Sequence, residues 1–402
     1  MTRQRVLRSL SVLAVAALTL SACGDDGGDT ETGTGQTGGD TRTYAIAFVG
    51  PLTGDNANLG INIRNGAKVA VQEANRAGGP KIELKEFDTQ GDPAQATTLK
   101  ERFVNDQSII GIVGPTFSGE TRAVMQPLQE ASLVMVSASA TNAALPTAVP
   151  NQTVFHRLVP DDDVQGKGVA DYVSKKLGAK RAAYVDDNSE YGKGLADGTR
   201  KLLEAAGVPT VATDSIDPRS QDFSAVVNRL RSANPDLIFY GGEYPEGSLI
   251  SNQAKGPQAM RVPVMGGDGI VDATYGKTAG AAANGDYATS VGAPPERLDS
   301  AKQFLADYAA AGFKDAYTAF GALAYDAANA IINTLPTALG SASAVDDSVR
   351  RKVLEGVGKV DFGGASGKVA FDSFGDTVTR ALTMYKVENL EFKPVKTGEF
   401  KG

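Results

Sequence analysis

Beyond its N-terminal segment, the chain alternates short apolar runs with longer stretches in which apolar residues recur at helical spacing. The runs have the length of buried strands, and strands separated by amphipathic helices are typical of repeated βα units around a mostly parallel sheet. The pattern therefore predicts an α/β fold. The runs expected to form strands are residues 44–50, 82–87, 109–113, 133–137, 182–185, 237–240 and 262–265.

The length of the chain predicts two domains. It has 402 residues, of which 42% are hydrophobic, enough apolar material for two cores of ordinary size. The alternation is interrupted at Val159-Pro160, and a new helical pattern starts directly afterwards, so we expect the chain to cross there into a second lobe. A long helix over residues 316–335 and a weak strand near 368–371 follow the second set of βα units, which indicates a return to the first lobe.

The composition excludes several functional classes. One His, one Cys and no Trp leave few of the groups that zinc sites, disulfides, thiol catalysis or a Ser-His-Asp hydrolase require. We therefore expect no enzyme activity, no cofactor and no metal. The formal charge of −7 also disfavours nucleic acid as a partner.

The N-terminus is typical of an exported protein. Basic residues precede an apolar run over residues 10–20 that is too short to span a bilayer, which predicts a signal peptide over residues 1–22. The following Leu-Ser-Ala-Cys resembles the bacterial lipobox, so Cys23 is expected to be lipidated and to hold the protein on the extracytoplasmic face of the cell membrane. The alternative is a plain signal peptide with an incidental Cys. The polar stretch up to residue 43 is interpreted as a flexible tether.

Small and polar residues follow the predicted strands. In open α/β sheets, ligands bind outside the carboxyl ends of the strands, so these segments are the expected binding loops. The triplet Asp161-Asp162-Asp163 stands at the predicted crossover. Acidic capping of a helix N-terminus is the favoured interpretation of this triplet, and a cation site is the alternative.

Spaced motifs along residues 44–390 match one known pattern. The motifs are Val49-Gly50-Pro51-Leu52-Thr53-Gly54, the segment 88–93, Val113-Gly114, the segment 137–142, Tyr191-Gly192-Lys193-Gly194-Leu195, Asp222-Phe223-Ser224, Phe239-Tyr240-Gly241-Gly242 and Met265-Gly266. In this order and spacing the chain resembles the leucine/isoleucine/valine-binding protein family, the extracytoplasmic receptors of branched-chain amino acid ABC importers.

The resemblance implies a type I periplasmic binding protein. This fold has two doubly wound, Rossmann-like lobes joined by three crossovers, and the lobes close on a ligand like a Venus flytrap. Here the crossovers are expected near Pro160, Val291 and Phe374. Lobe 1 would then comprise residues 44–160 and 290–373, and lobe 2 residues 161–289 and 374–402.

The resemblance also implies a set of binding residues. The ligand carboxylate would be held by Ser118 and by the loop Ser139-Ala140-Thr141, where hydroxyl and N–H groups bind anions without a counter-charge. Tyr191 would lean on the ligand from lobe 2. Asp268 would bind the ligand ammonium, one methylene shorter than the Glu usual in the family.

The chain departs from the family pattern at several positions. Two aromatic positions of the side-chain pocket fall on Leu59 and Glu243, although Tyr244 could replace the second ring after a shift of one residue. Asp88 and Phe117 occupy the places of the cysteines that form a disulfide in some members.

Taken together, these features predict a monomeric, lipid-anchored solute-binding protein. It would capture an amino acid, with branched-chain or aliphatic side chains favoured, and deliver it to the permease subunits of an ABC importer. A receptor for urea, short amides or another small amine-containing solute is the alternative within the binding class. A sensor ectodomain that transmits closure to a partner protein is a further alternative.

Overall fold

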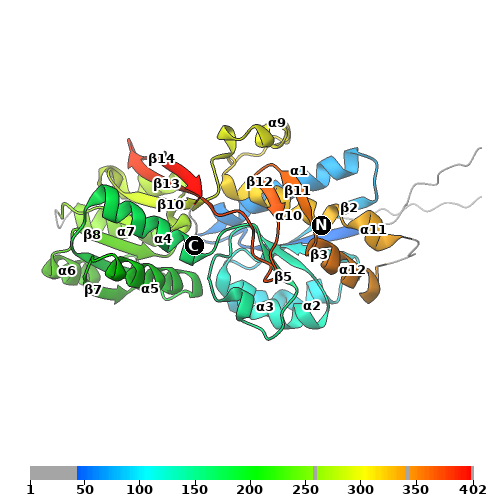
Figure 1. The fold of residues 1–402 in the computed structure, drawn as a ribbon, viewed down its shortest axis with the longest axis horizontal. Coiled ribbons are helices and arrows are strands. Elements are labelled where there is room, and N and C mark those ends of the chain that lie inside the picture. The colour runs from blue at the N-terminus through cyan, green and yellow to red at the C-terminus, as the bar shows by residue number, and fades with distance from the viewer. Residues whose placement is uncertain (1–42, 257–259, 341–344, 400–402) are drawn as a thin grey trace, which may run out of the picture. The chain divides into compact units, whose positions relative to one another are not determined.

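The structure, a computed structural model, describes residues 43–256, 260–340 and 345–399. It is an α/β protein with two large sheets, as the alternating pattern predicts (Figure 1). The first sheet is parallel throughout, in the order β2-β1-β3-β4-β5. Its strands are β1 (Thr43–Gly50), β2 (Lys81–Asp88), β3 (Ile109–Val113), β4 (Met135–Ser137) and β5 (Phe155–Arg157).

The second sheet is mixed, in the order β14-β13-β10-β9-β8-β6-β7. Strands β10, β9, β8, β6 and β7 are parallel to one another. Strand β13 pairs antiparallel with both β10 and β14. The strands are β6 (Ala182–Asp186), β7 (Thr210–Ser215), β8 (Leu237–Gly241), β9 (Val264–Gly266), β10 (Tyr287–Val291), β13 (Ala381–Glu388) and β14 (Glu391–Glu399); β11 (Asp361–Gly364) and β12 (Gly367–Ala370) form a separate hairpin.

Helices cover the sheets (Figure 1). The α-helices are α1 (Ala57–Arg76), α2 (Pro93–Val104), α3 (Ser118–Glu130), α4 (Asp162–Tyr172), α5 (Glu190–Ala205), α6 (Ser224–Ala233), α7 (Tyr244–Lys255), α8 (Ala273–Ala279), α9 (Lys302–Ala310), α10 (Ala319–Ile332), α11 (Leu335–Leu339) and α12 (Asp347–Val357). A π-helical turn, Val173–Leu177, extends α4, and short 3-10 helices lie at Leu145–Thr147, Asp268–Ile270, Gly280–Ala283, Pro295–Arg297 and Asp299–Ala301.

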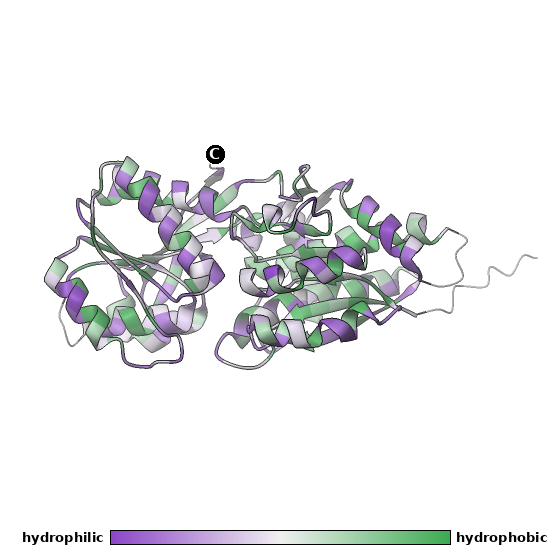
Figure 2. Ribbon diagram, turned by 90° about the horizontal axis from the view of Figure 1, so that it is seen from below, coloured by the Kyte–Doolittle hydropathy of each residue, from purple (hydrophilic) through white to green (hydrophobic). Residues whose placement is uncertain are grey.

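Strand β1 shows why the runs of the first sheet are almost continuously apolar. Its alternate side chains point to opposite faces, and both faces are packed by helices. Tyr44, Ile46 and Phe48 belong to one hydrophobic cluster, which also contains residues of α1 and α10. Ala45, Ala47 and Val49 belong to a second cluster, with residues of α2 and α3. Apolar segments accordingly concentrate in the interior strands, and the outer helix faces are hydrophilic (Figure 2).

Helices α1 and α10 pack unusually closely. A Cβ atom on Gly66 would lie 2.0 Å from the carbonyl oxygen of Gly321, so only glycine allows this approach. The contact holds α10 on the first sheet, where Ile331 packs against Gly111 of β3. The expected return of the chain to this sheet after the second set of βα units is therefore confirmed for α10.

The predicted strands are all present, with small shifts at their ends, such as β4 beginning at Met135 rather than residue 133. The chain passes from the first sheet to the second after β5, leaves the second sheet after β10 for segments such as α10 that pack on the first, and returns to the second after β12. The expected helix over residues 316–335 begins at Ala319 and ends at Ile332. The residue boundaries of the lobes stay a prediction, and the signal peptide, Cys23 and the tether up to residue 42 lie outside the described residues.

Arg350 on α12 joins this helix to the first sheet, and no described acidic side chain forms an ion pair with it. Its side chain is 2% exposed, and its guanidinium donates to the carbonyl oxygens of Ile109 at 3.1 Å, Val104 at 2.9 Å and Asp106 at 2.7 Å. The buried guanidinium thus donates three hydrogen bonds to backbone carbonyl groups.

We expect Arg350→Met to lower the free energy of unfolding by about 3 kcal/mol, because it removes the three hydrogen bonds that the buried guanidinium donates. Urea denaturation followed by circular dichroism measures the change. Arg351→Met, at the exposed neighbouring position of the same helix, is the matched control and should change stability by less than about 0.5 kcal/mol. Equal stability of the two variants would contradict this role of Arg350.

Candidate ligand-binding site

The structure brings six of the eight residues predicted to bind the ligand around one small cavity. The cavity has a volume of about 10 Å³, which is smaller than an amino acid. Its lining comes from both large sheets. The predicted residues are Leu59, Ser118, Ser139, Tyr191, Glu243 and Asp268, and the cavity is completed by Phe117, Gly269 and Phe320.

The carboxyl ends of parallel strands explain this convergence. Ser118 and Ser139 follow β3 and β4 of the first sheet, and Glu243 and Asp268 follow β8 and β9 of the second. Because parallel strands all end at the same edge, the loops after them meet there. The small strand-end residues that the sequence analysis singled out therefore place polar side chains at one site.

The first sheet contributes hydroxyl groups at the N-terminus of α3. Ser118 is the first residue of this helix and is 1% exposed, and its Oγ accepts from the N–H of Asn142 at 3.2 Å. The hydroxyl of Ser139 donates to the carbonyl oxygen of Thr116 at 2.6 Å. A helix N-terminus favours negative charge, so this wall suits an anionic group.

Ala140 and Thr141 do not line the cavity. Both are fully buried. The N–H of Ala140 donates to the hydroxyl of Ser137 at 3.0 Å, and the carbonyl oxygen of Thr141 accepts from the N–H of Asp162 at 2.9 Å. The loop after β4 uses these groups to hold itself and the start of α4.

Asp268 is held by neutral donors. Its Oδ1 accepts from the hydroxyl of Tyr191 at 2.8 Å and from Nε2 of Gln165 at 2.9 Å. The side chain is 3% exposed, and burial raises the pKa of its carboxyl group. With no Lys or Arg paired to it among the described residues, Asp268 is a buried carboxylate positioned to receive a cation.

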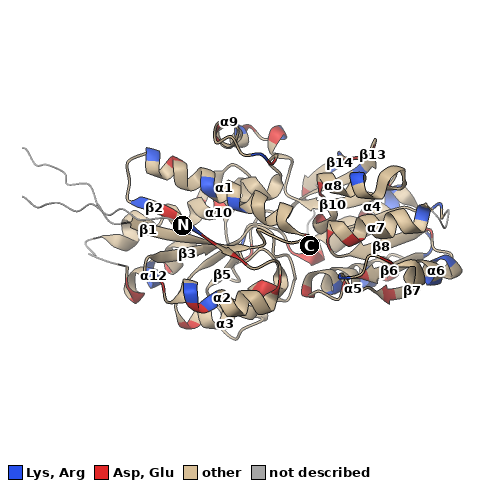
Figure 3. Cartoon of the chain, turned by 180° about the vertical axis from the view of Figure 1, so that it is seen from behind, with Lys and Arg blue, Asp and Glu red and all other residues tan. Residues whose placement is uncertain are grey.

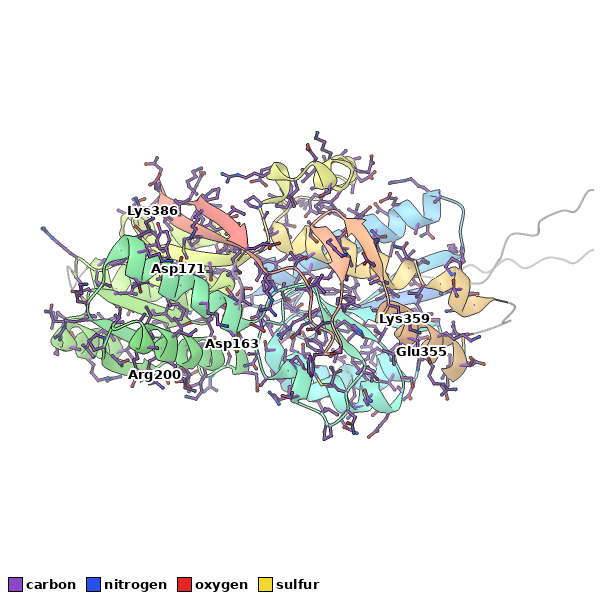
Figure 4. All side chains as sticks on the ribbon, viewed as in Figure 1. Asp163, Asp171, Arg200, Glu355, Lys359 and Lys386 are labelled. Carbon is purple, nitrogen blue, oxygen red and sulfur yellow. The ribbon has the colours of Figure 1, made fainter. Side chains whose placement is uncertain are left out.

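The Asp triplet caps α4, as the favoured interpretation predicts. The side chain of Asp161 accepts from the N–H of Val164 at 2.9 Å. Asp163 is exposed on the first turn (Figure 4), whereas Asp162 is buried and shares the Nε2 donor of Gln165 with Asp268. Burial, followed by the nearby charge of Asp268, raises the pKa of Asp162 well above its usual range. Within the described part of the chain, no group of His, Cys, Asp and Glu could hold a metal ion.

Glu243, and not Tyr244, faces the cavity. Glu243 lines it and is 8% exposed. Tyr244 is turned away, and its hydroxyl donates to the backbone carbonyl of Asp55 just before α1. Burial, followed by the charges of Asp187 and Asp268, raises the pKa of Glu243 well above its usual range.

A larger cavity of about 820 Å³ shares part of this lining, including Tyr191 and Glu243. Four further acidic residues line it: Asp187 directly after β6, Glu246 in the first turn of α7, and Glu190 and Asp217, which pair with Arg122 and Arg219. Lys and Arg lie largely on the outer helices and strands (Figure 3). The site is therefore acidic and lies next to an open volume large enough for a small solute.

Glu120 is a buried acid behind Ser118 in α3. Its Oε2 accepts from the N–H of Phe117 at 2.9 Å, and its Oε1 accepts from the hydroxyl of Thr89. The side chain is fully buried, and burial raises its pKa to about 7.

Several residues of the site were not predicted from the sequence. Phe117 and Phe320 line the cavity, and Gln165 and Asp162 support Asp268 from α4. Phe117 had been considered only as the place of a missing cysteine. The only available signal for Phe320 was its position at the start of a predicted helix, which does not reveal a ligand contact.

Comparison with known proteins identifies the family of this chain. A family model described as periplasmic binding protein matches residues 43–392. The Leu/Ile/Val-binding protein BraC3 of Rhizobium johnstonii is 33% identical over 346 residues, which cover 85% of this chain and 91% of BraC3. None of the described helices is long and apolar enough to cross a membrane.

Solved structures show the same fold. The leucine-binding protein LivK of Thermotoga maritima is 26% identical, with a TM-score of 0.78 over 89% of this chain and 99% of LivK. LivJ of Streptococcus pneumoniae, in complex with isoleucine, is 28% identical, with a TM-score of 0.76 over 88% of this chain and all of LivJ. A solute-binding protein of R. palustris, in complex with 4-hydroxybenzoate, has the same fold at 22% identity and a TM-score of 0.78.

We expect the ligand-free protein to lose stability as the pH rises from about 4.5 to about 7. Because the pKa of Glu120 is higher in the folded than in the unfolded chain, its contribution is fully present below pH 4.5 and is lost as the pH reaches about 7. Glu120→Gln should remove a loss on the order of 2–3 kcal/mol, measured by urea denaturation across this pH range. Glu130→Gln, at the exposed end of the same helix, should leave the pH profile unchanged. A Glu120→Gln profile parallel to the wild-type profile would contradict the assignment.

Proposed function

We propose, since this chain belongs to the periplasmic binding protein family, that it captures an α-amino acid outside the cytoplasm and delivers it to the permease of an ABC importer. The family and its relatives are solute-binding proteins of transporters, not enzymes. The identity of the solute and the anchoring of the chain are our proposals.

The observation that carries the choice of an amino acid is the buried carboxylate of Asp268. Tyr191 and Gln165 orient it with neutral hydrogen bonds. An ammonium group would supply the missing counter-charge, and a charge-assisted hydrogen bond in a dry site is strong.

The opposite wall suits the carboxylate of the same ligand. Ser118 and Ser139 line it, and the N-terminus of α3 adds a favourable field for a negative group. We propose that Ala140 and Thr141 act only indirectly, by shaping the loop after β4. Tyr191 then serves two purposes, because it both lines the cavity and holds Asp268.

The remaining lining supports an aliphatic carbon chain on the ligand. Leu59, Phe117 and Phe320 surround the cavity between the polar groups. Relatives named as Leu/Ile/Val-binding proteins are consistent with such a chain. A benzoate, the ligand of some structural neighbours, has no cation, so it would leave Asp268 and Glu243 buried without a counter-charge. Urea and short amides offer donors but no charge.

We further propose that the protein is a monomeric lipoprotein on the extracytoplasmic face of the cell membrane. The basic, apolar and small-residue segments before Cys23 support export and lipidation, and the polar tether that follows would let the folded part reach a permease.

We expect Asp268→Asn to weaken binding of the amino acid at least 100-fold, because the ligand ammonium then loses a buried carboxylate partner, a loss of about 3 kcal/mol. The twenty amino acids, urea and short amides are first screened by thermal shift, and the best ligand is then measured by isothermal titration calorimetry. The control is Asp163→Asn, an exposed carboxylate on α4, which should bind like wild type. Wild-type affinity in Asp268→Asn would overturn the proposed role of this residue.

For the anchor, Cys23→Ala should move the protein from the membrane fraction to the soluble fraction or the medium, because the chain has no other cysteine to lipidate. Fractionation of cells expressing the full chain, followed by immunoblotting, measures the distribution. A variant that still sediments with membranes would show that attachment does not depend on Cys23.

A further inference from the structure

Glu243 is a buried acceptor without a donor. Its Oε2 is inaccessible to solvent and has no hydrogen-bond partner in the described part of the chain. The side chain is 8% exposed and lines both cavities of the site. Asp268, by contrast, already receives two neutral hydrogen bonds. Such a group at the surface of a cavity indicates a ligand that supplies the donor.

Two more carboxylates accompany Glu243 on the side of the larger cavity. Asp187 is 5% exposed and Glu246 is 6% exposed, and neither forms an ion pair with a described Lys or Arg. The charges of Asp187 and Glu246 both contribute, after burial, to the raised pKa of Glu243. We call Asp187, Glu243 and Glu246 the acidic subsite.

The nearby cations are already used. Arg219 lines the larger cavity, and its guanidinium binds Asp217 at 2.8 and 2.9 Å. Arg122 binds Glu190 at 2.7 Å. These pairs leave the acidic subsite without a counter-charge from the described residues that line the cavity.

Other unpartnered polar atoms nearby are also able to accept. The Oδ1 of Asn56, which lines the larger cavity, is buried without a donor. The hydroxyl of Tyr240 is likewise buried without a partner, and a Cβ atom on Gly242 would lie within 2.8 Å of both this hydroxyl and Oδ2 of Asp187. Of these two atoms, Oδ1 of Asn56 belongs to a residue that lines the cavity, so it offers a donor-rich group a further acceptor.

We propose that the ligand is a cationic α-amino acid, whose side-chain ammonium or guanidinium group binds at the acidic subsite of Asp187, Glu243 and Glu246. The inference rests on the proposed function, in which Asp268 binds the α-ammonium group. The aliphatic part of the side chain contacts Leu59, Phe117 and Phe320, which line the same cavity as Asp268 and Glu243. A neutral amide would satisfy the hydrogen bonds of the subsite but would leave its charge uncompensated.

Paired isosteric ligands test this inference. Lysine and norleucine differ in the terminal ammonium, and arginine and citrulline differ in the charge of the terminal group, so each pair isolates the cation. We expect lysine or arginine to bind the wild-type protein at least about 100-fold more tightly than its neutral counterpart, measured by isothermal titration calorimetry. Equal or tighter binding of the neutral counterparts, or of leucine, would overturn the cationic ligand and leave the proposed amino-acid function intact.

Two matched variants test whether the preference for a cationic ligand depends on Glu243. Glu243→Gln removes the charge at nearly unchanged volume and should reduce the preference for the cationic ligand about tenfold or more. Asp163→Asn is the control, because this exposed carboxylate on α4 lines neither cavity, and it should retain the preference. Since Glu243→Gln keeps the volume of a side chain whose Oε2 has no partner among the described residues, loss of folding is not expected, and a thermal melt verifies this. Retained preference in Glu243→Gln would overturn the assignment of the subsite.

Failure of the proposed amino-acid function would give different binding results from failure of the cationic ligand. If no α-amino acid binds but a diamine such as cadaverine does, the acidic subsite is supported as a cation-binding site and the assignment of an amino-acid ligand fails. If neither amino acids nor diamines bind, both proposals are overturned.

Discussion

The common direction of the parallel strands is the constraint on which this structure depends. Strands β1, β3 and β4 of one sheet and β6, β8 and β9 of the other are covered on both faces, so their flanks are apolar and unavailable to a polar ligand. Polar side chains can gather only at the ends of the strands, where the chain turns into the next helix. Ser118, Ser139, Asp187, Glu243 and Asp268 all follow a strand in this way. The site is thus a consequence of the βα repeat.

Within this site, hydrogen bonding separates two kinds of buried acid. Asp268 is held by Tyr191 and Gln165, so its orientation is already determined before a ligand arrives. Glu243 has no such support for its Oε2, and its nearest charged neighbours are also acids. The first arrangement provides a rigid contact for one group of a ligand. The arrangement around Glu243 lacks a positive charge. The described side chains around it do not supply one, and in our proposal the ligand does.

The fold could be predicted from the sequence because apolar periodicity reports burial directly. The strands that were missed are β5, β7, β10, β11, β13 and β14. Three of these, β5, β7 and β14, lie at edges of the two large sheets, and β7 has no buried residue. For the site, the structure brings predicted residues next to strand ends, including Glu243, to the lining of the cavity. Ala140 and Thr141 lie outside this lining, and their backbone groups bond within the loop and to α4. Phe320 and Gln165 reach the site through the packing of helices from distant parts of the chain, which periodicity does not specify.

Two buried carboxylates elsewhere in the molecule contrast with Glu243. Asp286 accepts from Lys255, from the hydroxyls of Ser251 and Tyr275 and from the N–H of Val264, so all four of its acceptor positions are used. Asp326 accepts from the N–H groups of Ala365 and Ser366. These acids are buried and satisfied, which is the arrangement that stable packing requires. The fold can therefore satisfy a buried carboxylate where only structure is needed. Because it leaves Oε2 of Glu243 without a donor at the one place where a cavity opens onto the group, the missing partner is best explained as part of the ligand.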